Sequence, residues 1–112
     1  VNLLGEHVDY NDGFVLPVAI DRTVQVAASR VSNETVTLVA LDLNERVSFS
    51  LGRLGEKIDL NGDPLPSWAR YPAGVAHVLQ QEGLAGKGLQ AVFTSDVPIG
   101  AGLSSSAAVD VA

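Results

Sequence analysis

The stretch SDVPIGAGLSSSAAVDVA, residues 95–112, combines a strand end, a glycine turn and a helix start. Residues 89–94 predict the strand and Pro98 ends it, after which Gly100 and Gly102 allow a sharp turn. Three successive serines then offer capping side chains for a helix: Ser104, Ser105 and Ser106. The free N–H groups of a helix's first turn carry a partial positive charge, so this arrangement favours a phosphate. The stretch predicts an anion-binding loop.

The same loop has alternative interpretations. Glycine turns and serine caps also occur with a purely structural role. The loop differs from a Walker P-loop because no lysine followed by serine or threonine closes it. It also differs from the dinucleotide fingerprint, since Ser105 stands in place of the third glycine. A phosphate site of another kind and a structural turn therefore both stay open.

Length and composition indicate one domain or part of one. The chain has 112 residues, 46% of them hydrophobic, and a fold of that size buries about two-thirds of the unfolded surface. The chain does not begin with methionine, and Ala112 falls within the expected last helix. We therefore expect residues 1–112 to be a truncated piece of a larger protein.

Charge and composition argue against several partners. The formal net charge is −6 and the seven lysines and arginines are scattered, whereas a nucleic-acid surface needs clustered positive charge. The chain has no cysteine, which excludes a disulfide scaffold and thiolate metal sites. Its apolar runs are too short to cross a bilayer. We expect a cytoplasmic protein with no nucleic-acid or membrane partner.

Strand signals dominate the first half of the chain. A turn at Asn11, Asp12 and Gly13 predicts a hairpin between the first two strands. The later strands are expected to form an antiparallel sheet with one solvated face. Apolar alternation and β-branched residues place the strands at residues 1–4, 14–16, 23–28, 35–41, 46–51 and 89–94.

Helix signals follow the strands. Residues 52–66 carry three glycines and two prolines and predict a surface loop, and residues 68–81 predict a helix that Gly83 ends. The expected apolar stripe of this helix consists of Ala69, Val75, Ala76, Val78 and Leu79. A strand-rich half followed by helices is typical of an α+β fold.

A second polar cluster lies at Glu6, His7 and Asp9. Crowding two carboxylates is costly, because like charges repel and solvation is lost on burial, so a ligand that offsets the cost is expected. Carboxylates accept hydrogen bonds, and a polyhydroxylated sugar offers matching donors. Two alternatives remain, a metal site and a solvated turn, although no second histidine lies nearby in sequence.

Both clusters resemble known motifs. Residues 1–17, VNLLGEHVDYNDGFVLP, resemble the signature of the galactokinase family. Residues 98–107, PIGAGLSSSA, resemble the ATP-binding motif of the GHMP kinase superfamily, in the family's order and at about its spacing. Val8 stands where the family often has threonine.

The resemblance implies an α+β fold, namely a GHMP kinase N-terminal domain similar to ribosomal protein S5 domain 2. Residues 1–112 would then be a partial sugar- and ATP-binding domain. The implied activity is ATP-dependent phosphorylation of galactose at its anomeric hydroxyl. Two alternatives remain, a non-catalytic regulator that binds galactose and ATP, and a related sugar kinase.

The resemblance also assigns residues to ligands. Glu6, His7 and Asp9 would bind the sugar, and Ser106 would face Mg²⁺. The ATP-binding residues would be Gly100, Gly102, Ser104, Ser105 and Ser106 around the phosphates, with Trp68 and Tyr71 near the adenine. No catalytic residue is assigned within residues 1–112, because the family's catalytic aspartate and a further arginine and glycine-rich motif have no counterpart here. The fragment alone is therefore expected to be inactive.

Overall fold

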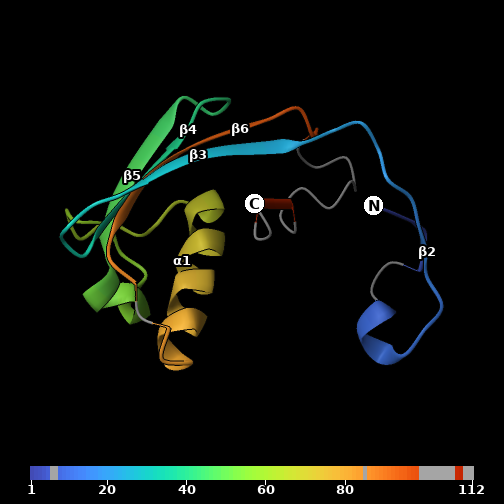
Figure 1. Ribbon diagram of the computed structural model, residues 1–112, viewed down its shortest axis with the longest axis horizontal. Helices are drawn as coiled ribbons and strands as arrows, with labels where there is room; N and C mark the ends of the chain where they lie inside the picture. Colours follow the sequence, from blue (N-terminus) through green and yellow to red (C-terminus); the bar gives the residue numbers. More distant parts are fainter. Residues whose placement is uncertain (6–7, 85, 99–107, 110–112) are drawn as a thin grey trace.

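The main sheet has four strands in the spatial order β3-β6-β4-β5 (Figure 1). The computed structural model describes residues 1–5, 8–84, 86–98 and 108–109. The strands are β3 (Val24–Arg30), β4 (Thr35–Ala40), β5 (Glu45–Ser50) and β6 (Leu89–Ser95). All four fall within a few residues of the positions that the sequence predicts.

The sheet is mixed, so the expectation of a purely antiparallel sheet is wrong. β6 lies between β3 and β4; it is antiparallel to β3 and parallel to β4. β3 and β4, which are consecutive in sequence, therefore do not pair. β5 ends at the end of the sheet where β4 begins, and the connection through α1 leaves from and comes back to that same end, so β6 runs parallel to β4.

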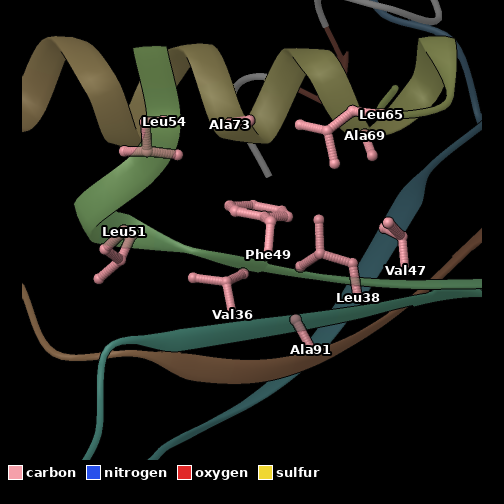
Figure 2. Packing of buried hydrophobic residues seen from close by; sticks show 10 residues of the cluster. All are labelled: Val36, Leu38, Val47, Phe49, Leu51, Leu54, Leu65, Ala69, Ala73 and Ala91. Carbon is pink, nitrogen blue, oxygen red and sulfur yellow. The ribbon is translucent and has the colours of Figure 1, made fainter. Parts of the chain in front are cut away.

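Helix α1 (Ser67–Gln81) covers one face of the sheet. Phe49 points from β5 toward α1, and Ala69 and Ala73 of the helix face the sheet (Figure 2). The two alanines are almost fully buried, because small side chains let the helix approach the strands closely. The core cluster comprises Val36, Leu38, Val47, Phe49, Leu51, Leu54, Leu65, Ala69, Ala73 and Ala91.

The predicted helix is present, but its predicted apolar stripe is only partly correct. Ala69 is buried and Ala76 packs against the core, whereas Val75, Val78 and Leu79 are 38–55% exposed. Ala73 takes the inward position instead, four residues after Ala69. Gly83 ends the helix as expected, with a φ of +75° that favours glycine.

Residues 52–66 contribute to the core, so the expectation of a simple surface loop is wrong. The segment contains most of a 3₁₀ helix, η2 (Leu51–Glu56), and an isolated bridge between Ile58 and Pro64. Leu54 and Leu65 are 7% and 2% exposed, respectively. The segment is part of the core despite its glycines and prolines, because Leu54 and Leu65 cover apolar surface between α1 and β5.

The predicted N-terminal hairpin is confirmed, and it forms a separate two-stranded sheet. β1 (Asn2–Leu4) pairs antiparallel with β2 (Leu16–Pro17), and the short 3₁₀ helix η1 (Asp9–Asn11) lies between them. Asp12 and Gly5 adopt positive φ angles that allow this tight return. Figure 1 shows this arm, residues 1–5 and 8–22, to one side of the main sheet and away from α1.

Within the part of the chain that the structure describes, no helix has the length and apolar character needed to cross a membrane.

Gly88, just before β6, provides a test of the packing. A Cβ atom there would lie 2.7 Å from the backbone nitrogen of Thr35 and 2.8 Å from the carbonyl oxygen of Asn33. We expect Gly88→Ala to lower the free energy of unfolding by about 1–3 kcal/mol through this overlap. Gly86→Ala is the matched control, because nothing lies within 4 Å of a Cβ at that position. Chemical denaturation measures both, and equal stability of the two variants would contradict the packing.

Candidate functional site

A pocket of about 520 Å³ opens at the end of the sheet where β6 ends, β3 begins and α1 starts. The β4–β5 turn forms one wall, and the first turns of α1 form another. Its residues include three aromatic side chains, two carboxylates and several apolar groups. They are Val24, Ala40, Asp42, Leu43, Glu45, Pro66, Ser67, Trp68, Tyr71, Phe93, Thr94, Ser95, Val97 and Val109.

Trp68 is fixed in this pocket by one strong hydrogen bond. Its indole Nε1–H donates to the Glu45 carboxylate at 2.6 Å, which joins the first turn of α1 to the first residue of β5. Tyr71 follows one turn later and is 45% exposed. The predicted pair Trp68 and Tyr71 therefore does line one pocket, and an anchored aromatic ring offers a face on which a planar ligand can stack.

Asp42 holds the end of β6 from the β4 side. Its carboxylate accepts the backbone N–H of Ser95 at 2.6 Å and the hydroxyl of Thr94 at 3.2 Å. β4 ends at Ala40, so the last N–H group of β6 has no strand partner on that side. The Asp42 side chain takes the place of the missing strand.

The chain that leaves β6 is held at Asp96 and Val97. The Ser95 hydroxyl accepts the N–H of Val97 at 3.1 Å, and the Val97 side chain is buried. Asp96 bonds the backbone of Thr23, at the start of β3. Hydrogen bonds therefore hold the chain as far as Val97, which precedes the predicted anion-binding loop in sequence.

Most of the other predicted site residues lie outside the described residues. They are Glu6, His7, Gly100, Gly102, Ser104, Ser105 and Ser106. Asp9 is the first residue of η1, and the structure describes its backbone but not its side chain. Among the described residues, no three histidine, cysteine, aspartate or glutamate side chains are grouped closely enough to hold a metal ion.

Sequence reasoning missed Asp42, Glu45 and Asp96. The turn composition at residues 41–44 signals only the end of a strand. The bond between Glu45 and Trp68 spans 23 residues, and the bonds between Asp42 and the end of β6 span more than 50. No local sequence pattern indicates a contact between residues so far apart in the chain.

Comparisons with known proteins agree with this arrangement. The galactokinase galactose-binding signature matches residues 1–30, and the GHMP kinases N terminal domain matches residues 70–112. The galactokinases of Roseiflexus sp. (strain RS-1) and Chloroflexus aurantiacus are 46% and 41% identical over all 112 residues. The chain spans 27% of the length of each of these relatives.

Solved structures show the same fold. The crystal structure of Lactococcus lactis galactokinase complexed with galactose matches 98% of this chain with a TM-score of 0.81 and 30% identity, over 28% of its own length. The mevalonate kinase of Methanococcus jannaschii matches 79% of the chain and 27% of its own length, with a TM-score of 0.61 and 20% identity. The second match concerns the fold alone.

The α+β fold of the chain is that of the GHMP kinase N-terminal domain. Within that class its relatives are galactokinases, whose galactose-binding signature it carries.

Replacing Glu45 tests the anchoring of Trp68. Glu45→Ala removes the acceptor of the indole N–H, so we expect the ring to gain freedom and contact with water. The emission of Trp68, the single tryptophan of the chain, should shift to longer wavelength, and acrylamide should quench it more strongly. The loss of stability should be about 0.5–1.5 kcal/mol. Glu82→Ala, an exposed carboxylate at the end of α1, is the control, and identical emission in both variants would refute the anchor.

Proposed function

We propose that the complete protein containing this chain transfers the γ-phosphoryl group of ATP to the anomeric hydroxyl of galactose. The observation that carries this proposal is the galactose-binding signature over residues 1–30, within a chain whose relatives along its full length are galactokinases. A structural neighbour, Lactococcus lactis galactokinase, was solved in complex with galactose. The GHMP fold alone would not specify the sugar, because function resides in the site.

The N-terminal arm is the proposed sugar-binding segment. Glu6, His7 and Asp9 supply two carboxylates and an imidazole within four residues, the groups that match a sugar's hydroxyl donors and acceptors. From Val8 to Gly13 the backbone turns sharply, since the N–H groups of Asn11 and Gly13 both donate to the carbonyl of Val8, at 3.0 and 2.8 Å.

The loop from Gly100 to Ser106 is the proposed ATP phosphate site. The pocket at the end of β6 fits the base of a nucleotide, because Trp68 provides an anchored aromatic face. The pocket's carboxylates, at Asp42 and Glu45, are acceptors of the kind that an adenine amine can use. The direction of β6 supports the proposal, since the strand ends at this pocket and continues into the loop.

Mg²⁺ is the proposed metal, with Ser106 as its contact on this chain. The ion would supply charge neutralisation on the phosphates. Phosphoryl transfer relies on positioning and on several charged groups acting together. The residues of this chain are proposed to bind and orient both substrates, and the proposed catalytic carboxylate is not among them.

Release of ADP by the complete protein tests the function. With ATP and Mg²⁺ present, galactose should stimulate ADP formation, whereas mevalonate should not. Stimulation by mevalonate alone would contradict the proposed substrate. Binding of galactose without ADP formation would contradict the kinase and favour the non-catalytic regulator.

If ATP and galactose bind at separate sites, a substitution in one site should lower the affinity for one ligand only. Gly102→Val puts a branched side chain where the backbone is proposed to approach phosphate, so ATP affinity should fall about tenfold or more. Galactose affinity should be unchanged. Isothermal titration calorimetry on the complete protein measures both affinities, and normal ATP binding by this variant would refute the phosphate loop.

Asp9→Ala is the reciprocal variant. It removes charge-assisted hydrogen bonds worth about 1.5–3 kcal/mol each, so galactose affinity should fall about tenfold or more while ATP still binds. Loss of both ligands in either variant, together with a lowered melting temperature, would indicate misfolding. Unchanged galactose affinity would exclude Asp9 from the sugar site.

A further inference from the structure

Two backbone segments from opposite parts of the chain are joined at Thr23 and Asp96. The backbone N–H of Thr23 donates to Asp96 Oδ1 at 2.5 Å, and the backbone N–H of Asp96 donates to the Thr23 carbonyl at 3.2 Å. These bonds lie immediately beyond Val24 and Ser95, the last paired residues of β3 and β6. The Asp96 side chain thus extends the sheet by one step at this end.

This junction is significant because of the two segments of the chain that meet there. Thr23 is where the N-terminal arm, with the proposed sugar residues, enters the main sheet. Asp96 is where the chain leaves β6 toward the proposed phosphate loop. Figure 1 shows the arm to one side of the main sheet, reached through the chain that precedes β3. The junction therefore joins the two segments proposed to bind the two substrates.

The strength of the junction comes from the backbone bonds. Arg22 also approaches Asp96, with 3.8 Å between Nη1 and Oδ2, but both side chains are about half exposed. An exposed ion pair contributes little. A carboxylate that accepts a backbone N–H makes a shorter and stronger bond. On the other edge of β6, Asp42 holds Ser95, so Asp96 fixes the remaining side of the strand end.

We infer that Asp96 is a positioning residue for phosphoryl transfer, one that holds the phosphate loop in register with the sugar-binding arm. This inference rests on the proposed function. The reacting atoms must be aligned closely, and misplacement by about 1 Å can cost a hundredfold in rate. A residue that ties the two segments together controls that alignment while it contacts neither substrate.

The test is steady-state kinetics of the complete protein with Asp96→Ala, Asp96→Glu and Asp96→Asn. Alanine removes the acceptor, and glutamate moves it by one methylene while keeping the charge. Both variants should lower kcat about tenfold or more, with KM for galactose and for ATP within about threefold of the unmodified protein. Asparagine keeps an oxygen acceptor for the Thr23 N–H and should restore most of kcat. Asp21→Ala, which removes a neighbouring carboxylate that is 95% exposed, is the matched control and should leave kcat unchanged.

The outcomes separate this inference from the proposed function. Absence of galactose phosphorylation by the unmodified protein would overturn the proposed function, and this inference with it. An active protein whose Asp96→Ala and Asp96→Glu variants keep normal kcat would overturn the inference alone. A fall in kcat that matches the loss of folded protein, measured by the melting temperature, would also overturn it, because the role would be purely structural. If the alanine variant does not fold, the glutamate variant decides.

Discussion

The insertion of β6 between β3 and β4 is the constraint on which the rest of the structure depends. Because β6 bonds an antiparallel neighbour on one edge and a parallel neighbour on the other, both its direction and its register are fixed. The start of β3, the β4–β5 turn and the first turn of α1 consequently gather around its last residues. The candidate nucleotide pocket is formed by that convergence, and the proposed phosphate loop continues from the same strand end.

Carboxylate side chains accept hydrogen bonds from N–H groups at this end of the sheet. Asp42 accepts from Ser95 on the β4 side, Asp96 accepts from Thr23 on the β3 side, and Glu45 accepts from the indole of Trp68. Two of these N–H groups lie at strand ends and the third is a side chain of α1, and in each case a charged acceptor makes a shorter and stronger bond than a neutral one.

Close packing by small side chains explains how a short chain covers one face of its sheet. Ala69 and Ala73 bring α1 against Phe49 and Leu38, and the leucines of η2 and the following turn close the side of this layer. The larger apolar residues of α1, Val75 and Leu79, instead line a second, apolar pocket between the helix and the sheet. Helix position is thus set by the smallest side chains, while Val75 and Leu79 line this second pocket.

The sequence by itself determined the position of every main strand, the N-terminal hairpin, the extent of α1 and the family, because these depend on local periodicity, turn residues and short motifs. Only the tertiary structure decided the strand order, the inward turn of Ala73 in place of Val75, and the burial of Leu54 and Leu65. It alone paired Trp68 with Glu45 and Thr23 with Asp96. The physical reason is separation along the chain: a partner 23 or 73 residues away leaves no periodic trace near either residue, and the partners meet only when β6 inserts between β3 and β4.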